Sequence, residues 1–144
     1  MAIVGFNFNK MHVERKGPIK GKVNIKNNIS IKAIEKTNLA LGSAKQDGLR
    51  FTFEFVTNYE PKVAEIFITG EVFDLQPEKK VEEVVKEWKK DKKIDTIIMT
   101  HVLNTVLSKC NVQALLLSKD MNLPPHIPLP KVGSRQAGQA STQV

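Results

Sequence analysis

Residues 49–75 read LRFTFEFVTNYEPKVAEIFITGEVFDL, with apolar and polar residues alternating on both sides of a turn signal. In the first arm every second residue is apolar, the two-residue period of a half-buried strand: Leu49, Phe51, Phe53 and Phe55. Between the arms lies Tyr59-Glu60-Pro61-Lys62, where proline fixes φ and cannot donate to a strand ladder. The stretch therefore predicts a β-hairpin that reverses near Pro61.

The second arm of this hairpin differs from the first because both of its faces carry apolar residues. Alternate positions from Ala64 to Val72 form one apolar face. Phe67, Phe73 and Leu75 lie on the other face. We expect this arm to be covered on both sides, or covered on one side and paired with another subunit.

Two further strands are expected before the hairpin. Residues 3–14 carry Phe6 and Phe8 on one phase and then Met11 and Val13 on the opposite phase, which indicates a β-bulge or a strand that bends between packing surfaces. Residues 22–33 alternate regularly and predict an antiparallel strand with one polar face. Its apolar face comprises Val23, Ile25, Ile29, Ile31 and Ala33. Residues 39–48 are rich in small residues and predict a loop.

Helical spacing replaces the alternation after Leu75. Residues 77–90 predict a first helix, and the apolar stripe from residue 94 toward 117 predicts a longer second one, with a kink at the lysine run between them. His101 falls on that stripe, so we expect a buried histidine with a hydrogen-bond partner rather than a catalytic one. The prolines of MNLPPHIPLP, residues 121–130, end the second helix.

The order of these elements defines an α+β fold class. We expect a four-stranded antiparallel sheet followed by a kinked or two-part helix packed on one face. A chain of 144 residues is long enough for one domain with a proper core, which we place at residues 1–132. Residues 133–144 are almost devoid of apolar side chains and predict a disordered polar tail.

Motifs for catalysis, cofactors or metals are absent from the sequence. The three histidines are widely separated, and the single Cys110 has no CxxC partner, so we expect neither a metal site nor an enzyme nor a cofactor. Cys110 lies in an apolar helical stretch, which predicts a buried, inert thiol. No apolar run could span a bilayer and the start does not resemble a signal peptide, so we expect a cytoplasmic protein without membrane insertion.

Positive charge is concentrated near the start of the chain. The net charge is +7, and residues 1–36 hold eight basic and two acidic residues, which accounts for six of the seven charges. Four of these lysines share one phase: Lys20, Lys22, Lys26 and Lys32. Such a face can track a phosphate backbone, although aromatic residues for base stacking are missing from it. A merely solvated strand face is the other interpretation.

Apolar residues exceed what one sheet and one helical layer obviously cover. The surplus includes Phe6, Phe8, Phe67, Phe73 and Leu75, together with residues 115–117. Exposed apolar surface of this kind indicates an oligomer interface or a groove for a nonpolar ligand.

The aromatic hairpin leads through IFITGEVFDL into a helix, and residues 104–117 are followed by the extended NLPPHIPLPKV. In this order the chain resembles the SecB-type export chaperones, which have a four-stranded antiparallel sheet followed by a long helix and assemble as a tetramer of two dimers. The resemblance implies a homodimer or tetramer that serves protein transport by holding unfolded or nascent polypeptide in apolar grooves. Candidate residues for polypeptide binding or the oligomer interface are Phe6, Phe8, Phe67, Phe73, Leu75 and Trp88.

The chain departs from that family in charge. SecB proteins typically present an acidic sheet face to the basic tail of the translocation motor, whereas this chain would present lysines. The alternative hypothesis is therefore a basic, ribosome- or RNA-associated accessory protein that uses the lysine-rich strand face.

Overall fold

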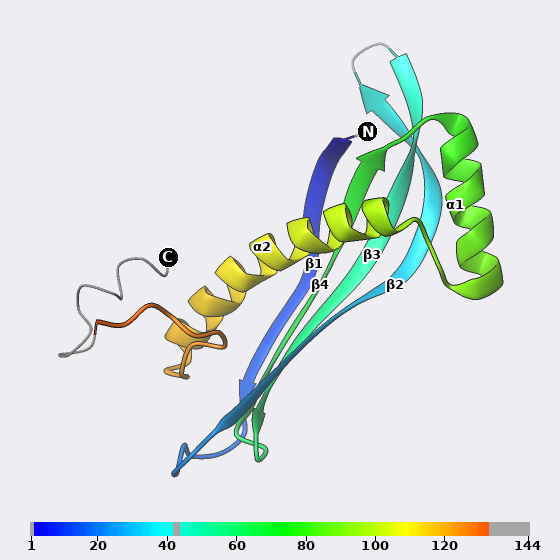
Figure 1. Ribbon diagram of the computed structural model, residues 1–144. Coiled ribbons are helices and arrows are strands. Elements are labelled where there is room, and N and C mark those ends of the chain that lie inside the picture. Colours follow the sequence, from blue (N-terminus) through cyan, green and yellow to red (C-terminus); the bar gives the residue numbers. More distant parts are fainter. Residues whose placement is uncertain (1, 42–43, 133–144) are drawn as a thin grey trace.

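The computed structural model describes residues 2–41 and 44–132. Four strands form one antiparallel sheet in the spatial order β1-β4-β3-β2 (Figure 1). Their bounds are Ala2–Arg15 for β1, Asn24–Leu41 for β2, Ala44–Glu60 for β3 and Ala64–Leu75 for β4. Two helices come after the sheet, α1 at Glu78–Asp91 and α2 at Thr96–Asp120. The predicted α+β class, with four antiparallel strands and a two-part helix on one face, is confirmed.

The hairpin of β3 and β4 is the centre of the sheet. It reverses at residues 61–63, where the Val63 amide donates to the Tyr59 carbonyl at 2.8 Å. Phe51, Phe53 and Phe55 are fully buried on the face that the helices cover. In β4, buried and half-buried residues alternate along the whole strand, as its two apolar faces predicted.

A β-bulge lies in β1 between Phe8 and Lys10, where one of the two sequence interpretations placed it. Phe8 pairs with Gly70 and Met11 pairs with Ile68, and both partners belong to the buried phase of β4. The extra residue therefore keeps Phe8 and Met11 on one face despite their opposite phases in the sequence.

A second bulge, in β2, corrects the predicted strand face. The register shifts between Ile31 and Ala33, so Ala33 faces away from the helices. Ile34 is placed in the core instead and is 3% exposed. A strict two-residue period cannot anticipate this change of phase.

The predicted loop at residues 39–48 is wrong. β2 continues to Leu41 and β3 begins at Ala44, with Thr37 paired to Gly48 and Leu39 paired to Gln46. A Cβ atom at Gly48 would lie 2.5 Å from Leu39 Cδ1, so the missing side chain leaves room for Leu39. Gly48, one of the small residues that indicated a loop, therefore allows close packing within the sheet.

The two helices are joined by a short connection. α1 ends at Asp91 and is capped by Lys92, whose φ of 57° is left-handed. The Asp95 carboxylate accepts from the Ile97 amide at the start of α2. The buried residues of α2 recur at every fourth position: Ile98, Val102, Val106, Cys110, Ala114 and Ser118. This seam is narrow, and His101 lies outside it and is exposed, so the prediction of a buried His101 is wrong.

Three segments pack on the same face of the sheet: α1, α2 and the residues that follow α2. α1 packs on β2 and β3, while α2 packs on β4 and, less extensively, on β1. Figure 1 shows α2 crossing the sheet obliquely and α1 standing at one margin. Residues 121–132, which we call the C-terminal strap, return to the sheet: Tyr59 Oη donates to the Pro124 carbonyl at 2.5 Å, and Asn27 Nδ2 donates to the His126 carbonyl at 3.0 Å.

The sequence also predicted a polar tail and no membrane insertion. The polar tail predicted at residues 133–144 falls outside the described residues. Among the residues described, neither helix is long and apolar enough to cross a membrane.

Candidate functional site

Half-exposed apolar side chains line β1 on the face that the helices cover. The rings of Phe6 and Phe8 meet edge to face at 5.0 Å, and Phe6 stacks on the buried Phe53 at 5.2 Å. Phe6 and Phe8 are only half-buried, and Met11 beside them is 40% exposed. We call this surface the β1 shelf and define it as Phe6, Phe8 and Met11, which pair with the buried phase of β4.

A glycine in β4 allows the phenylalanine rings to gather. A Cβ atom at Gly70 would lie 2.6 Å from Phe53 Cζ and would also collide with the carbonyl oxygen of Asn7. Without that Cβ atom, the Phe53 ring lies across Gly70 and reaches the rings of β1. The shelf therefore rests on the buried core.

β1 is also an edge strand. Among residues 2–41 and 44–132 it pairs only with β4, so its outer backbone groups have no strand beside them. Register shifts next to Ile3 and Phe8 interrupt this edge, which limits continuous pairing to short runs. An extended polypeptide could pair with such an edge while its side chains contact the shelf.

The other apolar candidates lie elsewhere. Phe67, Phe73 and Leu75 are half-buried on the opposite face of the sheet. Phe73 lies over Gly5, and Lys10 Nζ lies 5.6 Å from the centre of the Phe67 ring. The thickness of the sheet therefore separates these three residues from the β1 shelf.

Trp88 belongs to neither group. It is half-buried on α1 against the core, and Lys92 Nζ lies 5.0 Å from the centre of its ring. Of the candidates predicted from the sequence, the structure thus brings Phe6 and Phe8 into direct contact and leaves Trp88 apart.

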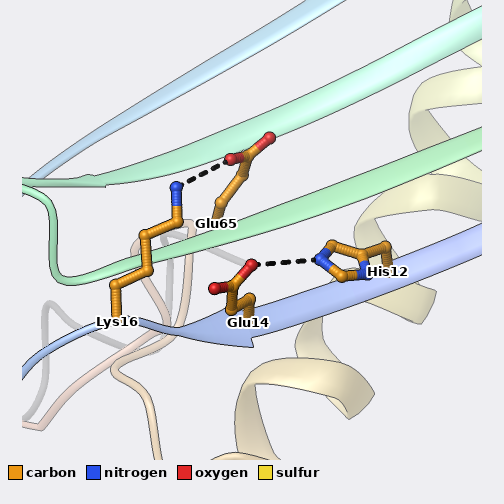
Figure 2. Close-up of polar contacts among 4 residues, drawn as sticks. All are labelled: His12, Glu14, Lys16 and Glu65. Atoms are coloured by element: carbon orange, nitrogen blue, oxygen red, sulfur yellow. Dashed lines mark hydrogen bonds and ion pairs between the residues drawn. The ribbon is translucent and has the colours of Figure 1, made fainter.

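Ion pairs run across the sheet face turned away from α2. Arg50 Nη2 lies 2.9 Å from Glu35 and its Nε lies 3.4 Å from Glu71. Nearer the Pro61 turn, His12 contacts Glu14 at 3.4 Å and Lys16 contacts Glu65 at 3.2 Å (Figure 2). Such exposed pairs each contribute little to stability, and they place charged side chains on this face of the sheet.

The predicted lysine face is divided in the structure. Lys26 lies 3.2 Å from Glu60 and Lys32 lies 4.0 Å from Glu54. Lys20 and Lys22 precede the first residue of β2 and are exposed. The four lysines therefore do not form one strand face, because only the latter half of the set lies on the strand.

Cys110 is fully buried, and burial raises the pKa of its thiol to about 12. This agrees with the expectation of an unreactive side chain. Within the described residues, no group of three or more histidine, cysteine, aspartate or glutamate side chains is arranged to hold a metal ion.

Buried polar residues are what sequence reasoning missed. Asp74 and Gln76 continue the buried phase of β4, so their position in the alternation could have revealed them. His126 is 3% exposed and lies 2.9 Å from Asn111 Oδ1, and burial lowers its pKa. No periodic signal marks His126, because it lies in a segment punctuated by prolines.

Comparison with known proteins adds evidence on the fold. No family model and no curated protein sequence matches the chain. Among solved structures, it is similar to the Mycobacterium tuberculosis SecB-like chaperone Rv1957, determined in complex with a ChAD peptide from the Rv1956 HigA1 antitoxin. The TM-score is 0.52 over 92% of this chain and 89% of that one. The chain has a SecB-like fold. At 12% sequence identity the similarity concerns the fold alone.

Proposed function

We propose that the chain is a SecB-like molecular chaperone, a non-catalytic cytoplasmic protein that holds unfolded or nascent polypeptide for protein transport. The observation that carries this proposal is the β1 shelf, an apolar surface beside a strand edge that no other described strand pairs with. The SecB-like fold supports it, since Rv1957 has been determined with a bound peptide.

The proposed mode of binding uses two kinds of contact. Apolar client side chains pack on Phe6, Phe8 and Met11, and each large side chain that becomes fully buried contributes about 1.5–3 kcal/mol. The client backbone pairs with the outer edge of β1, independently of sequence. Micromolar affinity corresponds to about 8 kcal/mol net, so a client needs several such contacts.

A homodimer or tetramer is part of the proposal. The face that carries Phe67, Phe73 and Leu75 is the proposed contact between copies. Its half-buried aromatic side chains lie among exposed ion pairs, and no helix of the described residues covers them. Size measurement of the purified protein by light scattering tests this part, and a monomer at working concentration would contradict it.

RNA or ribosome binding stays the alternative proposal. The exposed Lys20 and Lys22 favour it most, since Lys26 and Lys32 already face glutamates of β3. Replacing Lys20 and Lys22 by serine would then weaken RNA binding and reduce its salt dependence.

One experiment separates the two functions. Suppression of client aggregation and RNA pull-down are measured at low and high salt on the same preparation. A chaperone is expected to protect the client at both salt concentrations, because burial of apolar surface survives salt. RNA retention that falls steeply with salt, without client protection, would overturn the leading proposal.

A further inference from the structure

A small cavity lies between the end of β4 and the first turn of α2. Its volume is about 220 Å³, and its lining comprises Asp74, Gln76, Ile97, Ile98 and His101. Asp74 and Gln76 are buried, at 2% and 6% exposure, whereas His101 is exposed. The cavity therefore has mostly apolar walls, a buried carboxylate at Asp74 and exposed residues of α2 in its lining.

The hydrogen bonds of this cavity are incomplete. Gln76 Nε2 donates to Asp74 Oδ2 at 2.7 Å. Asp74 Oδ1 and Gln76 Oε1 are buried and have no hydrogen-bond partner among residues 2–41 and 44–132. Buried acceptors of this kind are costly unless a donor meets them. Because both unpaired atoms are acceptors, a group that binds in the cavity and satisfies them has to bring the donors.

The electrostatics favour a donor that is also positively charged. Burial raises the pKa of the Asp74 carboxyl, while the hydrogen bond from Gln76 and the positive charges of His101 and of the N-terminal amino group oppose the rise. A buried carboxylate is stabilised best by a cation that also donates hydrogen bonds. Ile98, at 4% exposure, and Ile97, at 74%, add apolar surface to the wall of the cavity.

We propose that this cavity binds an alkylammonium or alkylguanidinium group. Asp74 Oδ1 and Gln76 Oε1 accept its N–H donors, and Ile97 and Ile98 contact its alkyl stem. The cation can belong to a lysine or arginine side chain of a polypeptide or to a free small amine.

The cavity adjoins the β1 shelf. Asp74 pairs with Ile3, and the shelf residue Phe6 pairs with Val72 in the next row of the same face. A polypeptide on the shelf could therefore place a basic side chain in the cavity. Only this source of the cation rests on the proposed chaperone function.

Nuclear magnetic resonance titration of the full chain tests the cavity. The probes are n-butylammonium and n-butylguanidinium, with 1-butanol as a neutral comparator. We expect saturable shifts of the Gln76 side-chain amide and the Ile97 and Ile98 backbone amides with the cations, and none with butanol. Asp74→Asn should weaken binding at least about tenfold. Asp91→Asn removes the same charge at an exposed position of α1 and should leave binding unchanged.

A second variant covers the case in which Asp74→Asn alters folding. Ile97 is exposed, so Ile97→Lys should fold normally and bring its own ammonium group to the cavity mouth. This variant should bind added n-butylammonium much more weakly than the wild type does. Unweakened binding would place the ligand elsewhere and overturn the proposal.

Two short apolar peptides that differ only in a central lysine or norleucine identify the source of the cation. Preference for the lysine peptide that disappears in Asp74→Asn supports a polypeptide side chain. Equal binding of both peptides beside Asp74-dependent binding of n-butylammonium supports a free amine. If neither peptide binds the wild type while n-butylammonium does, the chaperone function is overturned and the cavity remains supported. If no cationic probe distinguishes the wild type from Asp74→Asn, the cavity is hydrated only and the proposal fails.

Discussion

The two edges of the sheet differ in how their apolar side chains are covered. At the β2 edge, α1 lies over one part and the C-terminal strap lies over another, held by Tyr59 and Asn27. At the β1 edge, α2 packs less extensively, and Met11 remains 40% exposed. The apolar side chains of the two edge strands are thus either buried or accessible, depending on whether a helix or the C-terminal strap lies over them. The proposed function belongs to the less covered edge.

Gly70→Ala should break the β1 edge most severely. The added Cβ would collide with the Phe53 ring and the Asn7 carbonyl, and overpacking of this kind costs about 1–3 kcal/mol or more. Chemical denaturation measures the loss of stability, and hydrogen exchange should show β1 amides opening before β2 amides. Gly17→Ala is the matched control, because its nearest neighbour would be the Lys62 carbonyl at an ordinary 3.7 Å. Equal stability of the two variants would contradict this account of the shelf.

Acid should loosen the covered β2 edge. Burial lowers the pKa of His126 below its ordinary value of 6.5, so below pH 6.5 the unfolded chain binds more protons at this residue than the folded one. The free energy of unfolding should therefore fall as pH decreases from 6.5 toward the folded pKa, by at most about 1.4 kcal/mol per pH unit.

Denaturation of the wild type and of His126→Gln across this pH range measures the contribution of His126. The variant should lose that part of the pH dependence. An identical pH dependence in both proteins would show that His126 titrates alike in the folded and unfolded chains.

Tyr59→Phe should affect the strap more mildly. The substitution removes the hydrogen bond to the Pro124 carbonyl, which we expect to cost about 1 kcal/mol. Faster hydrogen exchange at Leu123 and His126, with β1 amides unchanged, would locate the effect. Unaltered exchange in the strap would mean that Tyr59 does not hold it.

Features that depend on local spacing could be predicted from the sequence, whereas features that depend on neighbours across the sheet could not. The hairpin, the β1 bulge and both helices could be predicted because alternation and helical spacing record local geometry. The β2 bulge and the paired strands over residues 39–48 could not, because Ile34 and Gly48 obtain their roles from neighbours across the sheet. For the site, Phe6 and Phe8 could be singled out, but their separation from Phe67 and Phe73 depends on which face each strand turns toward the helices.

Met11→Asp tests the central claim most directly, through suppression of client aggregation. Met11 is 40% exposed on the β1 shelf. A carboxylate at this position should weaken binding of apolar client side chains with little loss of folding stability. Val112→Asp, at a residue of α2 that is 61% exposed, adds the same charge away from the shelf. We expect Met11→Asp to lose most of the protection and Val112→Asp to retain it. Full protection by Met11→Asp, or equal losses in both variants, would contradict the assignment of polypeptide binding to the β1 edge.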